Sequence, residues 1–126
     1  MTPSKAVYDG IYMLCAGIGN TTDFIDEEKH GRELPIIFIG EGNLGEEETL
    51  ELIGTVNQTV HVYGLPTQRF ELDEIAGRVR NGMKSGIAER GYKLTNPRVS
   101  TRILQDNSTS QTLIHYVLDY SVTFNK

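Results

Sequence analysis

Residues 112–124 carry an apolar side chain at every second position, with His115, Asp119, Ser121 and Thr123 between them. The apolar residues of this series are Ile114, Tyr116, Leu118, Tyr120, Val122 and Phe124. A period of two is typical of a β-strand with one buried face. At ~3.4 Å per residue this strand is about 44 Å long, whereas a domain of this size has a radius of gyration of about 14 Å. We therefore expect the strand to reach past its own core and to present an unpaired edge to another chain.

Shorter patterns along the rest of the chain predict further elements. Apolar residues at helical spacing mark two helices, over residues 3–16 and 69–86. Continuous or alternating apolar runs mark three more strands, over residues 35–40, 53–63 and 94–103. Polar segments with glycine predict loops at residues 20–33 and 41–50, and a polar segment predicts a hairpin tip at residues 105–111.

The predicted order is αββαββ within a single domain, residues 1–126. Two helices segregated from a run of neighbouring strands are typical of the α+β class. We expect a mainly antiparallel four-stranded sheet with two helices, ending in a long C-terminal β-hairpin. A domain of this length buries roughly two-thirds of its unfolded surface, so it needs neither a metal nor a disulfide to fold.

Composition argues against several classes of protein. Hydrophobic residues make up 38% of the chain, and no apolar run approaches the ~18 residues of a membrane span. Residues 1–10 lack the apolar core of a signal peptide. Cys15 is the only cysteine, which excludes an internal disulfide and a multi-cysteine zinc site. We expect a soluble protein of the reducing cell interior, with no membrane partner.

Charge is divided unevenly along the chain. The net charge is -5, but residues 23–51 hold ten acids and two bases, a local charge of -8. The remaining seven acids and ten bases sum to +3. Such a division is typical of a solvated acidic surface, and it also suits the two sides of a head-to-tail contact between copies of one chain.

Neither the histidines nor the cysteine predict a catalytic or metal site. His30, His61 and His115 have no metal-binding spacing, and the two on strands are interpreted as surface residues. His115 and Asp119 lie on one strand face, but about 14 Å apart, which is too far for a hydrogen bond. Cys15 sits in the apolar stripe of the first helix, where a thiol behaves as a small hydrophobe.

The remaining motifs are also better explained without chemistry. Residues 40–45 match GxGxxG, but three glutamates follow at once and would repel a pyrophosphate. The acids of residues 23–28 lack the spacing of a calcium loop. The arginines of the second helix and third strand have no aromatic platform among them, in a chain of acidic net charge. We therefore predict no enzyme activity, no cofactor and no metal.

The order of elements, with the sequences that mark them, resembles the tail terminator, or minor tail, proteins of long-tailed phages. Four stretches carry this resemblance across nearly the whole chain: a proline-started strand (residues 34–40), a valine-rich strand ending in an aromatic residue (58–63), a helix (70–76) and a long hairpin (94–103 with 113–124).

The resemblance implies a homo-oligomeric ring, commonly a hexamer, in the virion tail, assembled in the host cytoplasm. Such a ring caps the tail tube, stops polymerisation of the major tail protein and offers a docking face to a head-completion protein. DNA passes through without specific binding, and we expect part of the acidic segment to line the bore, because carboxylates repel phosphates.

Charge complementarity suggests where neighbouring copies meet. We expect arginines of the second helix and third strand to contact the acidic loop of the next copy. The candidate interface residues are Glu46, Glu47, Glu48, Arg78, Arg98 and Arg102.

Three alternatives remain open from the sequence. The first is another phage neck or head-completion protein, which would also form a ring. The second is a small hydrolase, which predicts His61 or His115 beside an acid in a concave pocket. The third is a monomeric binding module.

Overall fold

A computed structural model of the chain describes residues 3–22, 34–47, 53–84, 87–89, 92–107 and 112–125. The elements follow in the order α1 (Pro3–Ala16), β1 (Thr21–Thr22), β2 (Ile36–Glu47), β3 (Ile53–Gly64), the short 3-10 helix η1 (Pro66–Gln68), α3 (Arg69–Met83), β4 (Ile87–Glu89), β5 (Tyr92–Asp106) and β6 (Leu113–Asn125). None of the helices in these ranges has the length and apolar character needed to cross a bilayer.

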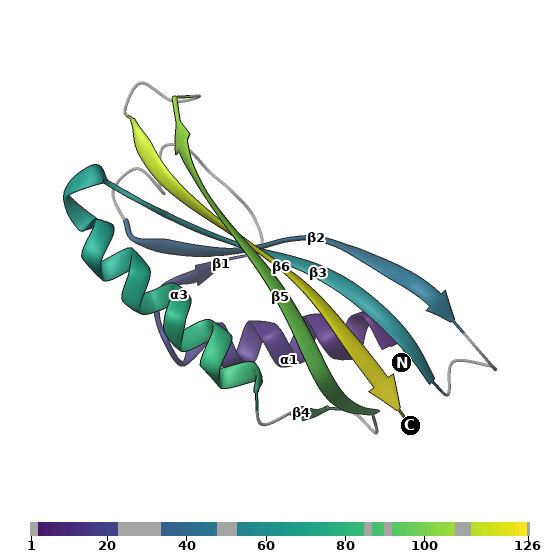
Figure 1. The fold of residues 1–126 in the computed structure, drawn as a ribbon. Helices are drawn as coiled ribbons and strands as arrows, with labels where there is room; N and C mark the ends of the chain where they lie inside the picture. The colour runs from purple at the N-terminus through teal and green to yellow at the C-terminus, as the bar shows by residue number, and fades with distance from the viewer. Residues whose placement is uncertain are drawn as a thin grey trace.

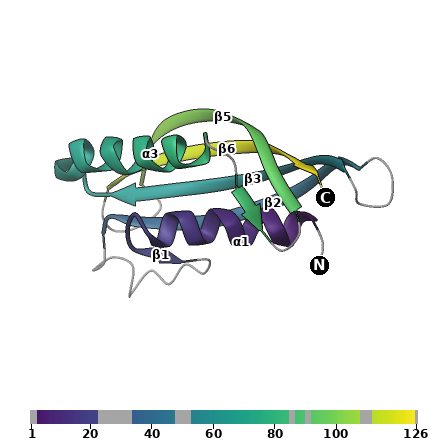
Figure 2. The ribbon, with the colours of Figure 1, turned by 90° about the horizontal axis from the view of Figure 1, so that it is seen from below.

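One twisted sheet carries both helices on the same face (Figures 1 and 2). Its strand order is β1-β2-β3-β6-β5-β4, and β1 runs parallel to β2 while the other neighbours are antiparallel. The predicted α+β class is confirmed. The predicted four-stranded sheet is wrong in detail, because two short strands extend it at the edges and make it mixed. Strands of two or three residues are too short to produce a periodic pattern.

Most predicted boundaries agree with the structure, and two predicted loops do not: β1 (Thr21–Thr22) lies inside the loop predicted at 20–33. The first helix and the strand at 53–63 match α1 and β3, and α3 ends three residues before the predicted position. The loop predicted at 41–50 is wrong for residues 41–47, which continue β2 opposite β3 through two irregularities in register. At these irregularities β2 carries extra residues opposite β3, so a segment with the composition of a loop still continues the strand. Residues 48–50 and 23–33 lie outside the described parts of the chain.

From Tyr116 to Phe124, β6 shows the predicted alternation of burial except at Val117, which lies on the other face and is also buried, 3% exposed. Tyr116, Leu118, Tyr120, Val122 and Phe124 are all buried against the helical layer. The expectation of an unpaired edge on this strand is wrong. β6 pairs with β3 over residues 53–64 and with β5 over residues 93–106, so backbone partners occupy both of its sides. Sequence periodicity reports the buried face of a strand but not its neighbours.

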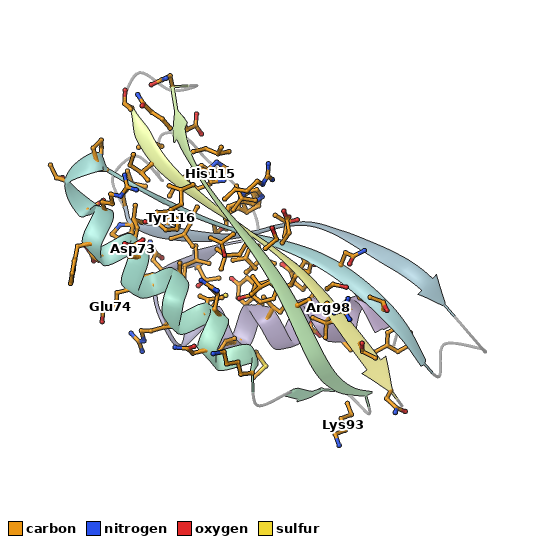
Figure 3. All side chains as sticks on the ribbon, viewed as in Figure 1. Asp73, Glu74, Lys93, Arg98, His115 and Tyr116 are labelled. Atoms are coloured by element: carbon orange, nitrogen blue, oxygen red, sulfur yellow. The ribbon has the colours of Figure 1, made fainter. Side chains whose placement is uncertain are left out.

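The helices complete the core from one side. α1 buries Val7, Ile11 and Cys15, and α3 buries Leu72, Ala76 and Val79, in one cluster with the sheet. The two helices approach closely at Gly82, where an added Cβ would clash with the side chain of Leu14. At the other end of α3, the hydroxyl of Tyr116 donates a hydrogen bond to the Asp73 carboxylate, which fastens the helix to β6 (Figure 3).

Gln58 is the one buried polar side chain in the described core, 4% exposed. Its Nε2 donates to the carbonyl of Gly40 at 2.8 Å and to that of Thr59 at 3.2 Å. Gly40 lies where the register between β2 and β3 shifts, between Ile39 and Gly42. A carbonyl at such a shift loses its ladder partner, and the amide of Gln58 replaces it.

Replacing Gln58 by methionine, which keeps the volume and removes the donor, should therefore destabilise the fold. We expect the free energy of unfolding to fall by about 1–3 kcal/mol, the cost of an unsatisfied buried carbonyl. Urea unfolding followed by circular dichroism measures this change. Asn57→Ala, on the exposed side of the same strand, is the matched control and should change stability little. Equal stability of Gln58→Met and the parent would contradict this role.

Burial of Cys15 predicts a second, pH-dependent effect on stability. Burial raises the pKa of its thiol from 9.0 to about 12, so the folded chain keeps a proton that the unfolded chain loses between these values. The associated stability is complete below pH 9 and is lost as the pH rises toward 12. The slope for one such group is at most about 1.4 kcal/mol per pH unit.

Urea unfolding of the parent and of Cys15→Ala at several pH values between 8 and 11 tests this expectation. The alanine variant should be less stable at pH 8 but should lose stability less steeply as the pH rises. Burial also raises the pKa of Tyr116 and Tyr120, so part of the alkaline loss should persist in both proteins. Identical slopes would contradict the buried neutral thiol.

Candidate functional site

No described helix covers the second face of the sheet, and cross-strand pairs order its side chains into rows. One row joins Tyr63, His115 and Leu104 across β3, β6 and β5. The next row joins His61, Val117 and Arg102 across the same strands. We call this surface the open face, and it is composed of the residues that alternate with the buried ones.

Aromatic rings cluster on the open face at one end of β3 and β6. Tyr63 stacks on His115 with ring centroids 4.1 Å apart. The Nδ1 atom of His61 lies 2.6 Å from Nε2 of His115, so one imidazole donates a hydrogen bond to the other. Phe38 adds a third strand to the cluster, 5.5 Å from His61. An added Cβ at Gly40 would lie 2.7 Å from His61 Nε2, so a larger residue at position 40 would clash with the imidazole ring.

The histidine pair corrects the interpretation of His61 and His115 as separate surface residues. They lie on the outward face, as expected, but they are half-buried and touch each other. The contact forms because β6 returns to lie beside β3 after two intervening strands. No local signal in the sequence identifies this neighbour, since the two residues are 54 positions apart.

A smaller polar group lies on the open face around Asp119. Thr59 Oγ1 donates to Asp119 Oδ1 at 2.9 Å, and Arg102 Nη2 lies 3.6 Å from Asp119 Oδ2. The side chains of Arg102 and Asp119 are 59% and 45% exposed, so solvent screens this ion pair and its contribution to stability is small. The described partners of Asp119 thus lie on the neighbouring strands β3 and β5. This agrees with the predicted separation of Asp119 and His115 along one strand, which is too large for a hydrogen bond.

The structure separates the predicted interface residues into three groups. Arg98 and Arg102 are exposed on β5 and share the open face (Arg98 in Figure 3). Arg78 is exposed on α3, in the helical layer on the other face, so it does not join them. Glu46 and Glu47 form the end of β2. Glu48 lies outside the described residues.

The sheet has two long strand edges without a described partner. On one side, β4 pairs only with residues 92–94 of β5, so residues 95–106 have no described strand beyond them. On the other side, β1 pairs only with Ile37 and Phe38 of β2, so residues 39–47 are likewise unpaired on the outside by any described strand. The β5 edge also carries two exposed apolar side chains, Ile103 (46%) and Leu104 (43%).

Two features of the described residues bear on chemistry: the one thiol and the distribution of potential metal ligands. Cys15 is fully buried, and its raised pKa keeps the thiol protonated at neutral pH. No group of three or more potential metal ligands forms within the described ranges. Unpaired β-edges, in contrast, are ready templates for pairing with another chain. Comparison with protein-family models and with curated proteins finds no match for this chain.

Proposed function

We propose that the chain is a structural subunit of a long-tailed phage tail, which assembles into a ring through its two free sheet edges. The observation that carries the proposal is that both outer strands of one sheet end in long stretches without a described partner. Natural proteins usually cover or shorten such edges, because they invite pairing with other chains. Two edges that no described strand covers, on one small domain, therefore favour assembly as the role.

The position of the edges favours a head-to-tail contact. The free parts of β2 and β5 lie on opposite sides of the sheet. A contact between the β5 edge of one copy and the β2 edge of the next uses two different surfaces, and it repeats until the rotation closes a ring. The sheet would then continue from subunit to subunit.

Charge supports the same pairing. β5 presents Arg98 and Arg102, whereas β2 ends with Glu46 and Glu47 inside the acid-rich segment 23–51. Opposite charges on the two edges favour contact between unlike edges and disfavour contact between like ones. Ring formation should consequently weaken at high salt, because exposed charges are screened within ~8 Å at physiological ionic strength.

The assignment to phage tails rests on the resemblance in element order. In that role the ring caps the tail tube, ends polymerisation of the major tail protein and docks a head-completion protein, while DNA passes through without specific binding. No enzymatic step is needed for this role. Another neck or head-completion protein would use the same edges, and binding to purified tail tubes rather than to DNA-filled heads distinguishes the two.

Paired charge reversals test the head-to-tail contact. One variant carries lysine at positions 46, 47 and 48, and a second carries Arg98→Glu with Arg102→Gln. The second change is to a neutral residue because Arg102 faces Asp119. Each variant alone has two edges of like charge, so we expect it to stay monomeric in analytical ultracentrifugation at low salt. Mixed in equal amounts, they should form a ring in which the two variants alternate.

The mixing experiment contains its own control, because each variant serves as the other's partner. Circular dichroism should show that both variants fold like the parent. Assembly of either variant alone, or failure of the mixture to assemble when the parent does, would contradict the edge-to-edge contact. In phage, the lysine variant should reduce the yield of capped tails, and a normal yield would contradict the tail role.

The apolar part of the β5 edge gives an independent test. Ile103→Lys should weaken assembly, because a charge that must be partly desolvated replaces an apolar side chain beside the joined strands. Met13→Lys is the matched control, since Met13 is an apolar residue 66% exposed on α1, outside the sheet. We expect the control to assemble like the parent in sedimentation experiments. Equal effects of the two substitutions would contradict a role for this edge.

A further inference from the structure

A cavity of about 280 Å³ lies between the C-terminal half of α3 and strands β5 and β6. Six residues line it: Gly77, Arg80, Asn81, Lys84, Val99 and Tyr120. The cavity lies on the helical side of the sheet, whereas the open face and its histidine pair lie on the other side. Its volume is at the lower limit for small-molecule sites, so it suits a small group rather than a nucleotide.

The hydroxyl of Tyr120 gives the cavity an unsatisfied donor. Tyr120 is 2% exposed, and its Oη has no hydrogen-bond partner within the part of the chain that the structure describes. Burial raises the pKa of this hydroxyl, an effect that the nearby Arg80 partly offsets, so the group keeps its proton. Buried hydroxyl groups are rarely left without a partner, because desolvation is then uncompensated.

Two cations stand on the same side of α3. Arg80 and Lys84 are one helical turn apart, and no ion pair is recorded for either among the described residues. Like charges at this spacing repel each other. Asn81 adds an amide that can donate a hydrogen bond into the same space. Four donor groups, two of them charged, thus line one small cavity, and none of its described lining residues is a carboxylate.

Gly77 is also a lining residue, and the space beside its Cα is open. A Cβ built at this position meets no atom within 4 Å. Any other residue there would direct its side chain from the helix surface into free volume. Glycine in a helix interior is unfavourable relative to alanine, so a glycine at this position lowers the stability of α3.

We propose that this cavity binds an oxyanion group, a carboxylate or a phosphate, through Tyr120, Arg80 and Lys84. The anion would accept a hydrogen bond from the Tyr120 hydroxyl and would relieve the repulsion between the two cations. Charge-assisted hydrogen bonds of this kind are among the stronger ones in proteins. The inference stands on the cavity alone and does not depend on ring formation.

Titration with inorganic phosphate and with acetate, at constant ionic strength and followed by NMR, tests the site on the intact chain. We expect saturable binding by the parent. Arg80→Gln and Lys84→Gln should each weaken it at least about tenfold, as for hydrogen bonds to charged groups. Tyr120→Phe should weaken it roughly 2- to 13-fold and should not destabilise the free protein, because it removes an unsatisfied group.

Two controls separate a built site from general attraction of anions. Lys93→Gln removes the same charge from an exposed position of β5 outside the cavity, and it should leave the affinity unchanged. Gly77→Leu fills the cavity without a backbone clash and should abolish binding while the fold persists. Unchanged affinity in Tyr120→Phe, or a loss in Lys93→Gln equal to that in Arg80→Gln, would overturn the proposal.

Sedimentation distinguishes two sources of the bound anion, a carboxylate of a second copy and free phosphate. If a carboxylate of a second copy occupies the cavity, phosphate at constant ionic strength should dissociate oligomers of the parent, and Gly77→Leu should not form them. If free phosphate is the ligand, both proteins should assemble alike and only the titration should differ. Saturable binding in the parent and its loss in Gly77→Leu support the site in both cases.

Discussion

The backbone pairing of β6 with two different strands is the constraint on which the rest of the structure depends. Because β3 and β5 flank it along its length, β6 lies in the middle of the sheet. One of its faces supplies the largest buried side chains of the core. Its other face supplies His115 and Asp119 to the open surface. Every surface discussed above takes its position from this strand.

The same pairing explains where the unsatisfied groups lie. Because β6 is central, β5 is displaced outward, and most of its outer side has no described partner. At the same time α3 reaches over β6 at Tyr116 and Tyr120. It makes a hydrogen bond with the first, whereas the hydroxyl of the second has no partner among the described residues.

The parts of the fold that follow from the spacing of apolar side chains were predictable. The helix at 3–16 and the buried positions of β6 follow from periods of 3.6 and two, and both are confirmed. The strand through residues 41–47 was not predictable, because its glycines and acids are typical of loops and only the partner strand holds it extended. For the candidate site, Arg98 and Arg102 were correctly placed on one exposed strand face, whereas Arg78 lies on the other side of the sheet.

The sequence by itself determined both helices and the apolar face of β6, because these faces appear in the local spacing of side chains. Only the tertiary structure decided which strands are neighbours. Backbone hydrogen bonds are alike for every pair of strands, so partner and register follow from contacts between distant residues. The contact of His61 with His115, the free edge of β5 and the cavity beside Tyr120 all depend on that choice.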